Sequence, residues 1–187
     1  MTAPRLLVAA ALFIGCSRPT RPLPVFHTVG EFTLTAHTGA EFHSDGMLKG
    51  KVWVADFIFT NCQGPCPRMS TQMSRVQAAL SDVPDIRFVS FTVDPVNDTP
   101  EVLAAYAKRY AATPDRWFFL TGTEQALHKL KREAFLLGNV DGSLNHSTRF
   151  VLVDRAGRIR KFADTSEASS IPELIEDARA LVREPLT

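Results

Sequence analysis

The chain has 187 residues, with 21 lysines and arginines, 20 aspartates and glutamates, and 45% hydrophobic residues. This charge balance excludes a protein that holds nucleic acid or an anionic membrane surface by charge, because it offers neither partner a basic surface. The length suits one globular domain, and thirteen phenylalanines supply much of a core. The sequence contains no internal repeat and no low-complexity stretch.

The N-terminus has the pattern of an export signal. After Arg5 comes an apolar run from Leu6 to Ile14, which is followed by Gly15 and Cys16. The run is shorter than the roughly 20 residues that cross a bilayer, so it is typical of the hydrophobic region of a secretory signal. The small residue before Cys16 fits cleavage that leaves Cys16 as the new N-terminus, which resembles a bacterial lipoprotein signal. An uncleaved signal anchor or a buried first helix is the alternative.

This interpretation divides the chain into three segments. Residues 1–15 are a lipoprotein-type signal peptide, residues 16–30 are the anchor and a proline-containing tether, and residues 31–185 form the domain. We therefore expect a protein of the bacterial cell envelope. A lipid on Cys16 would hold it in the cytoplasmic membrane, with the domain on the outer, periplasmic or extracytoplasmic face.

Within the domain, predicted strands and helices alternate. The strand patterns are either continuous and apolar, as in a strand covered on both faces, or alternate between apolar and polar residues. They lie at residues 31–35, 51–59, 86–93, 117–120, 148–153 and 158–162. The last two flank Asp154-Arg155-Ala156-Gly157, which is a hairpin signal. This order predicts an α/β fold with one central mixed sheet and helices on both faces.

Four helices are expected between and after these strands. The first helix follows the first long strand and is indicated by apolar residues at helical spacing, Met69, Met73, Val76 and Leu80. This spacing favours core packing of both methionines over metal binding. Thr99-Pro100-Glu101 begins a second helix, in which Val102, Leu103, Tyr106 and Tyr110 share one face. Thr123 caps a third helix, which extends to about residue 135. Ser170 and Glu173 have capping-box spacing and begin the last helix.

Cys62 and Cys66 lie where the strand at residues 51–59 ends and the first helix begins. Unpaired backbone N–H groups and the positive end of the helix dipole favour thiolate over thiol there. Three residues separate the cysteines, so both sulfurs reach one small ion. The pair is therefore suited either to redox chemistry or to binding a soft metal, and the spacing does not decide between them.

His146 lies in a polar loop directly before the strand at residues 148–153. In an open sheet, neighbouring strand ends converge on one edge, which would bring this histidine to the cysteines. Two thiolates and one neutral imidazole form a soft set of low coordination number that suits copper(I), whereas structural zinc usually takes a fourth protein ligand. A solvated histidine on the surface is the alternative.

Several short motifs occur in a defined order from Phe32 to Val182. They are Thr60-Asn61-Cys62 with Cys66-Pro67, Val93-Asp94-Pro95 with Asp98-Thr99-Pro100-Glu101, Trp117 with Leu120-Thr121-Gly122, and His146-Ser147-Thr148 with Leu152-Val153-Asp154. In this order they resemble the Sco/SenC family of thioredoxin-fold copper proteins. Two departures are Gln63, where many members have proline, and Lys161-Phe162-Ala163 in place of the family's Gly-Tyr-Tyr.

The resemblance implies a thioredoxin-like fold and a copper site on Cys62, Cys66 and His146. It also implies a metallochaperone for the dinuclear copper site of cytochrome c oxidase subunit II, or for another copper acceptor. A disulfide between Cys62 and Cys66 would have to be reduced before copper binds, which implies an envelope thiol reductant as a further partner. Asp94 either orients His146 or serves as a turn residue.

Two other activities remain open at this point. One is a dedicated thiol-disulfide reductase in which Cys62 and Cys66 form the redox pair and act on the acceptor's cysteines. Thioredoxin-like reductases place a cis-proline where this chain has Ser147-Thr148, which weakens general reductase activity without excluding a dedicated one. The other is a thiol peroxidase, but Thr60 stands only two residues before Cys62, and the peroxiredoxin pattern is absent.

Overall fold

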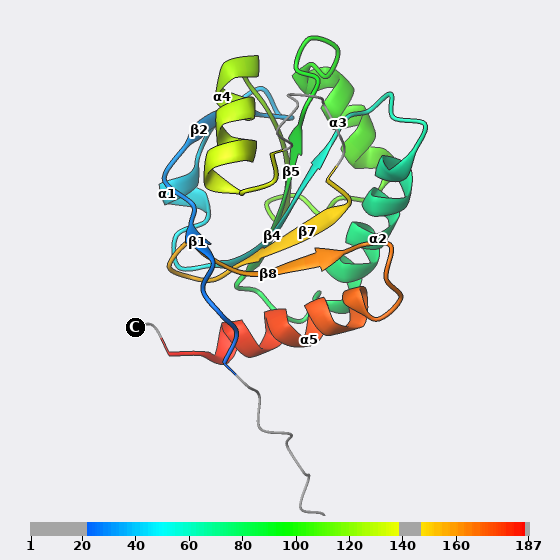
Figure 1. Cartoon of the computed structure of the whole chain (residues 1–187). Coiled ribbons are helices and arrows are strands. Elements are labelled where there is room, and N and C mark those ends of the chain that lie inside the picture. Colours follow the sequence, from blue (N-terminus) through cyan, green and yellow to red (C-terminus); the bar gives the residue numbers. More distant parts are fainter. Residues whose placement is uncertain (1–21, 139–146, 186–187) are drawn as a thin grey trace, which may run out of the picture.

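Eight strands form one mixed sheet in the computed structural model, which describes residues 22–138 and 147–185 (Figure 1). They are β1 His27–Thr28, β2 Thr33–Ala36, β3 Glu41–His43, β4 Val52–Ile58, β5 Ile86–Thr92, β6 Trp117–Thr121, β7 Arg149–Val153 and β8 Arg158–Asp164. Their order across the sheet is β1-β8-β7-β4-β5-β6-β2-β3. The three central strands β4, β5 and β6 run parallel, and the other neighbours are antiparallel.

Helices cover both faces of the sheet, as the sequence predicted (Figure 1). They are α1 Ser44–Met47, α2 Pro65–Ala79, α3 Pro100–Arg109, α4 Glu124–Lys129, the π-helical turn η1 Leu130–Ala134 and α5 Ser170–Arg183. The helices α2, α3 and α5 pack on one face, and α1, α4 and η1 on the other. Within the described ranges, no helix combines the length and the hydrophobicity needed to cross a membrane.

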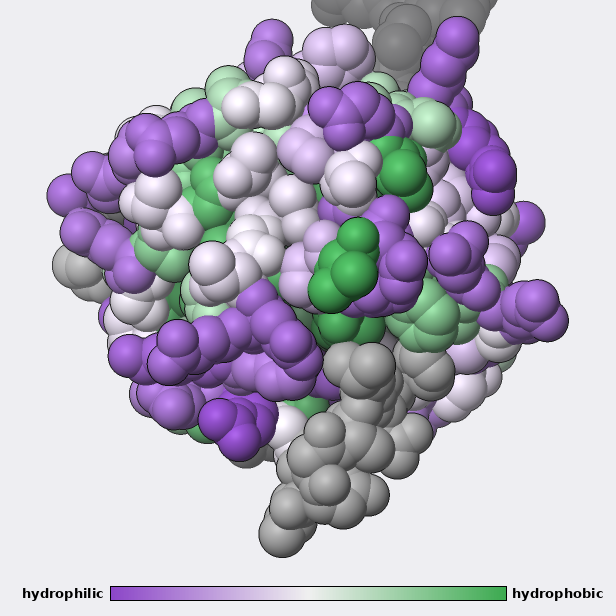
Figure 2. All heavy atoms as spheres, turned by 90° about the horizontal axis from the view of Figure 1, so that it is seen from above, coloured by the Kyte–Doolittle hydropathy of each residue, from purple (hydrophilic) through white to green (hydrophobic). Residues whose placement is uncertain are grey.

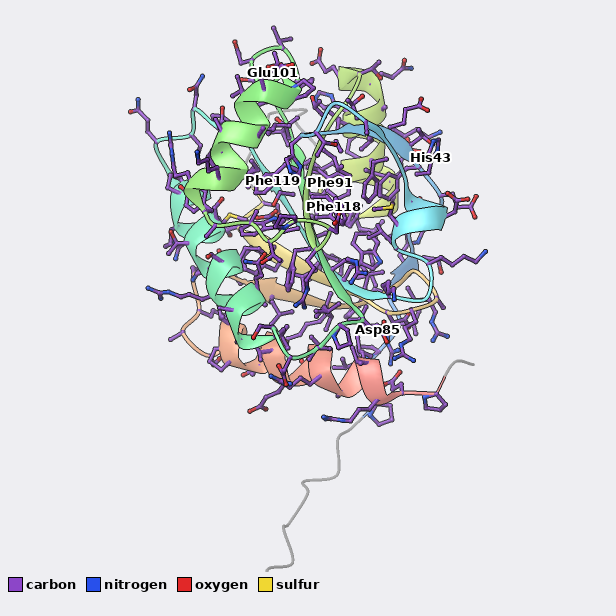
Figure 3. All side chains as sticks on the ribbon, turned by 180° about the vertical axis from the view of Figure 1, so that it is seen from behind. His43, Asp85, Phe91, Glu101, Phe118 and Phe119 are labelled. Carbon is purple, nitrogen blue, oxygen red and sulfur yellow. The ribbon has the colours of Figure 1, made fainter. Side chains whose placement is uncertain are left out.

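Alternation along the central strands divides the core in two. On β4, Val54 faces α2 and α5, whereas Trp53 and Phe57 face α4 and η1. Neighbouring residues of β6 separate in the same way, and Figure 3 shows Phe119 on the α3 side and Phe118 on the α1 side. All seven residues of β4 are buried, which confirms a strand covered on both faces.

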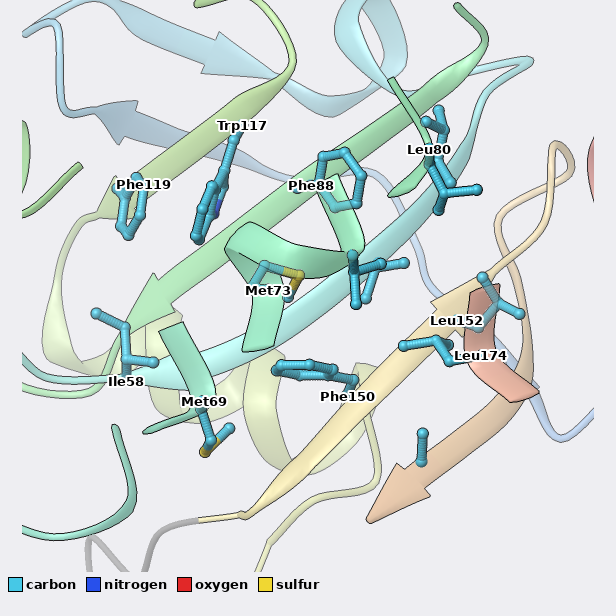
Figure 4. Packing of buried hydrophobic residues seen from close by; sticks show 14 of the residues in the cluster. Ile58, Met69, Met73, Leu80, Phe88, Trp117, Phe119, Phe150, Leu152 and Leu174 are labelled. Atoms are coloured by element: carbon cyan, nitrogen blue, oxygen red, sulfur yellow. The ribbon is translucent and has the colours of Figure 1, made fainter. Parts of the chain in front are cut away.

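Helix α2 fills the first of these cores with its methionines. Met69 and Met73 are fully buried and lie among Ile58, Phe88 and Phe150 (Figure 4). Thioether side chains adapt to irregular gaps between larger apolar groups, which suits these positions. The prediction that both methionines belong to the core is confirmed.

The helices α3, α4 and α5 all begin where the sequence predicts, but only two of the three predicted caps form. The hydroxyls of Thr99 and Thr123 cap α3 and α4 by accepting hydrogen bonds from backbone N–H groups three residues later, over 3.4 and 3.2 Å. The capping box at Ser170 does not form. Ser170 is already helical, its hydroxyl donates to Glu167, and Ser169 is the N-cap.

The apolar face of α3 differs by one residue from the prediction. Leu103, Tyr106 and Ala107 are buried, and Tyr110 packs against the same core. Val102 is 39% exposed because it points away from this face. A helix with 3.6 residues per turn places Leu103, Tyr106, Ala107 and Tyr110 in one stripe, and Val102 falls outside it.

The N-terminal segment is attached at the end of the sheet where the β7–β8 hairpin turns. Arg160 on β8 donates from Nη2 to the carbonyl of Leu23 over 2.7 Å and from Nε to that of Pro24 over 3.1 Å. β1 then pairs with β8. The last part of the expected tether, residues 16–30, therefore contacts the domain. On the same strand, Lys161 binds Asp177 of α5 over 2.6 Å.

Candidate metal centre

Residues 59–66, here called the cysteine turn, lead from β4 into the start of α2. β4 ends at Ile58, and the backbone N–H of Cys62 donates to the carbonyl of Phe59 over 3.3 Å. Cys66 follows Pro65 in the first turn of α2, where a residue without an N–H group fits a helix start. Both cysteines are free, with exposed fractions of 6% for Cys62 and 0% for Cys66. The predicted strand-to-helix junction is confirmed.

The two thiols lie close enough to interact, and this affects the acidity of Cys66. Burial raises the pKa of the Cys66 thiol, and a hydrogen bond with Cys62 raises it further, while the backbone N–H of Phe59 opposes both. The expectation that the helix start favours a thiolate is therefore wrong for Cys66, because loss of water outweighs the helix dipole there. An ion that binds both sulfurs must displace the Cys66 proton.

A second ionisable group, Asp56, lies in the same core. It is fully buried on β4, and burial raises the pKa of its carboxyl to about 7. Ser90 is its partner in the sheet register, but the Ser90 hydroxyl accepts from the Trp117 indole over 3.0 Å, and neither oxygen of Asp56 makes a hydrogen bond of good geometry. Its negative charge would further raise the pKa of Cys66. A lone carboxylate in an apolar strand was the sequence signal for this group.

His146 lies outside the described residues, so its role as third ligand stays a prediction. The strand that follows it is described, and β7 runs antiparallel to β4 with Val151 opposite Ala55. Continuing this register brings Arg149, the first residue of β7, to the end of β4 that leads to the cysteines. In residues 22–138 and 147–185, no three His, Cys, Asp or Glu side chains gather as a metal-binding group.

Hydrogen bonds join the start of β7 to α2. Thr165 donates from its N–H and its Oγ1 to the carbonyl of Thr148, over 2.9 and 2.7 Å. The Thr165 carbonyl accepts from Arg68 Nη1 over 3.1 Å and from Gln72 Nε2 over 3.0 Å. The chain directly after residue 146 is thereby tied to the helix that carries Cys66.

Of the two roles considered for Asp94, the structure shows the turn role. Its carboxylate accepts from the Asn97 side-chain amide over 2.8 and 3.0 Å, and its carbonyl accepts from the Asp98 N–H over 2.9 Å. An effect on His146 stays untested. The carboxylate that reaches the cysteine turn is that of Asp98, which accepts hydrogen bonds from Thr60. Sequence reasoning missed it, since the two residues are 38 positions apart.

The cysteine turn between a central strand and a helix, within a mixed sheet covered on both faces, defines a protein of thioredoxin-like fold. The chain belongs to the SCO1/SenC family, whose model matches residues 21–183. It is 34% identical over 183 residues to the SCO1 protein homolog of Bacillus subtilis, and the match covers 93% of this chain and 94% of the relative.

Solved structures agree with this assignment. A SCO1/SenC family lipoprotein from Bacillus anthracis is 32% identical, with a TM-score of 0.75 over 89% of this chain and 99% of its own. BsSco is described as a Sco family cytochrome c oxidase assembly protein with a disulfide switch. It is 32% identical to this chain, with a TM-score of 0.75, and the match covers 90% of this chain and 100% of BsSco. Copper-bound yeast Sco1, at 24% identity and a TM-score of 0.67 over 84% and 91%, shares the fold.

Proposed function

We propose that this protein is a copper(I) metallochaperone that supplies the dinuclear copper site of cytochrome c oxidase subunit II. Cys62, Cys66 and His146 would hold the ion. The observation that carries the proposal is the pair of free, neighbouring thiols at the strand-to-helix junction, on the side of the sheet where β7 starts. Membership of a family whose relatives include an oxidase assembly protein and a copper-bound structure supports it.

The chemistry of these donors favours copper(I) as cargo. Thiolates select soft ions, and a three-donor set leaves room for an incoming ligand. Copper would pass to an acceptor when a sulfur of the acceptor binds the ion and one of the three donors leaves, with no change in the oxidation state of copper. Each thiol loses a proton on binding and regains it on release, because only the thiolate ligates.

We also propose that the protein works at the outer face of the cytoplasmic membrane. Residues 1–15 would be removed as a signal, and a lipid on Cys16 would anchor the chain. The similarity to a SCO1/SenC lipoprotein supports this proposal. Metabolic labelling with a radioactive fatty acid tests it, because Cys16→Ser should abolish labelling while Cys62→Ser should leave it unchanged.

Copper loading tests the main proposal. We expect the reduced protein to bind one copper(I) under anaerobic conditions, with sulfur and nitrogen scattering in X-ray absorption. His146→Ala should lose most copper affinity while its dithiol still reduces a peptide disulfide, and Cys66→Ala should lose both activities. His128→Ala is the matched control, since this histidine lies on α4 beside Glu124. A site with four sulfurs or only oxygen donors contradicts the proposal.

A dedicated thiol-disulfide reductase is the second candidate. The two free cysteines, which interact across one turn, favour it, because such a pair can form the disulfide that thiol exchange requires. In this reaction one thiolate attacks an acceptor disulfide, and the other displaces the mixed disulfide, so that the acceptor gains two electrons and two protons. Oxidase assembly in cells that lack the parent gene separates the candidates: full rescue by His146→Ala supports the reductase.

A further inference from the structure

A buried carboxylate joins the turn before Cys62 to the end of β5. Asp98 is 0% exposed. Its Oδ1 accepts from the Thr60 hydroxyl over 2.5 Å, and its Oδ2 accepts from the Thr60 N–H over 3.1 Å and from the Thr92 hydroxyl over 2.5 Å. No ion pair found in the described residues includes Asp98.

This arrangement is costly to disturb. A buried carboxylate without a cation is stable only when hydrogen bonds replace its water, and bonds to a charged oxygen are about twice as strong as neutral ones. Asp98 also directly precedes Thr99, the N-cap of α3, where the helix dipole favours negative charge. Its position is fixed from the other side, because its N–H donates to the carbonyl of Asp94.

Thr60 carries this constraint to the cysteine. It lies inside the short turn that the bond from Cys62 N–H to Phe59 carbonyl closes. Two bonds from one residue, through its N–H and its hydroxyl, fix both the backbone and the side chain of Thr60 against Asp98. The sulfur of Cys62 is two residues further along, so its distance from the sheet and from Cys66 depends on this contact.

We infer that Asp98 is a positioning residue that holds Cys62, through Thr60, in the geometry in which both sulfurs reach one soft ion. The inference deepens the proposed function and rests on it for the copper readout alone. Groups that orient metal ligands typically contribute tenfold to hundredfold to affinity. Loss of the Thr60 bond should therefore weaken copper(I) binding, and it should also change how fast the Cys62 thiol reacts.

Two threonine hydroxyls donate hydrogen bonds to Asp98, and this allows a matched test. Thr60→Val and Thr92→Val each replace a hydroxyl by a methyl group and each remove one 2.5 Å bond to the same carboxylate. Only Thr60 belongs to the cysteine turn. Thr60→Ser keeps the hydroxyl and is the rescue variant. Each protein is reduced, its copper(I) affinity is measured by competition with a chromophoric chelator, and the alkylation rate of Cys62 by iodoacetamide is followed by mass spectrometry.

We expect Thr60→Val to lower copper(I) affinity about tenfold or more and to change Cys62 alkylation several-fold, whereas Thr92→Val and Thr60→Ser stay near the parent protein in both. Equal effects of Thr60→Val and Thr92→Val, or no change in Cys62 alkylation by Thr60→Val, would overturn the inference. Alkylation involves no copper, so failure of the copper proposal alone leaves this test intact.

Discussion

At the scale of single residues, burial has the strongest effect on ionisable groups. Asp56 and Cys66 both lie in the core beneath the cysteine turn, and the pKa of each is raised because the charged form loses water. The two groups also repel each other when both are charged. In the metal-free protein the Cys66 thiol is therefore neutral, and the Asp56 carboxyl is neutral below its raised pKa of about 7.

Asp56→Asn should change how stability depends on pH. In the folded protein the pKa of Asp56 is raised from 3.8 to about 7, so between these values the folded state binds more protons than the unfolded state. The protonated Asp56 therefore contributes to the free energy of unfolding below pH 4. This contribution is lost as pH rises toward 7, by up to about 1.4 kcal/mol per pH unit. Asn does not titrate, so this slope should disappear and the variant should be the more stable protein at pH 8.

Urea unfolding between pH 4 and 8 measures this effect. Asp85→Asn is a suitable control, because Asp85 lies near the surface, pairs with Lys51, and has a lowered pKa, so that it titrates below this range and its loss should leave the slope between pH 4 and 8 unchanged. Glu101 lies in the first turn of α3, and Figure 3 shows Asp85 at the opposite end of the molecule. An unchanged pH slope in Asp56→Asn would show that Asp56 stays ionised in the fold.

Oxidation of the two cysteines should abolish copper binding. A disulfide between Cys62 and Cys66 leaves neither sulfur as a thiolate, and only thiolates ligate. We therefore expect the oxidised protein to bind copper(I) at least a hundredfold more weakly than the reduced protein, and full binding to return with a thiol reductant. Anaerobic titration of both forms checks this. Equal affinity would mean that copper binds elsewhere.

At the scale of elements, α2 both carries Cys66 and fills the core. Met69 and Met73 lie one turn apart and face β4, β5 and α3. Arg68 and Gln72, in the first half of the same helix, donate to the carbonyl of Thr165. Packing along α2 therefore supports the position of Cys66 without any methionine acting as a ligand.

Met73→Ala should separate packing from metal binding. Removing a fully buried methionine leaves a cavity, and such changes cost about 2–5 kcal/mol of unfolding free energy. Met73→Leu conserves volume and should cost less than about 1.5 kcal/mol. Chemical denaturation gives these values, and copper(I) stoichiometry should stay at one in both variants. Loss of copper from the well-folded Leu variant would identify Met73 as a ligand.

At the scale of the whole molecule, one arginine ties both ends of the described chain to the sheet. Arg160 bonds to the carbonyls of Leu23 and Pro24, to Asp154 in the β7–β8 turn, and to Glu184 just after α5. Burial opposes ionisation of Asp154, but hydrogen bonds from Arg158, Arg160 and Ala156 hold its pKa below the usual value. The cluster lies at the hairpin end of the sheet, away from the cysteine turn (Figure 1).

Arg160→Met should destabilise the protein without changing the cysteines. The variant keeps an apolar stem but leaves Asp154, which is nearly fully buried, with fewer partners, and we expect a loss of about 2–4 kcal/mol. Arg179→Met removes an exposed pair with Asp82 and should cost no more than about 1 kcal/mol. Urea unfolding compares them. The difference between parent and Arg160→Met should shrink as pH falls and Asp154 becomes protonated.

The surface at the other end of the molecule is mixed in character. Figure 2, viewed from above, shows hydrophilic side chains toward the margin and paler and hydrophobic ones nearer the centre. Val96, in the loop between β5 and α3, is the most exposed of the large hydrophobic residues in the described chain. Within this loop, the Asn97 side-chain amide donates to both carboxylate oxygens of Asp94.

Features that depend on near neighbours could be predicted from the amino-acid sequence alone. The apolar run of β4, the caps at Thr99 and Thr123, and the strand-to-helix junction at Cys62 are set by residues within one or two turns, and their patterns predicted an α/β fold correctly. The order of motifs predicted the family, and the family model then confirmed it.

Contacts between groups far apart in the sequence follow from the packed fold and could not be predicted. The fold removed Cys66 from water and so reversed the expected shift of its pKa, and it gave the Ser170 hydroxyl to Glu167 instead of a capping box. It also brought Asp98 to Thr60, across 38 residues of sequence. Burial and long-range hydrogen bonds are properties of the surfaces that pack together, and no local pattern records which surfaces these are.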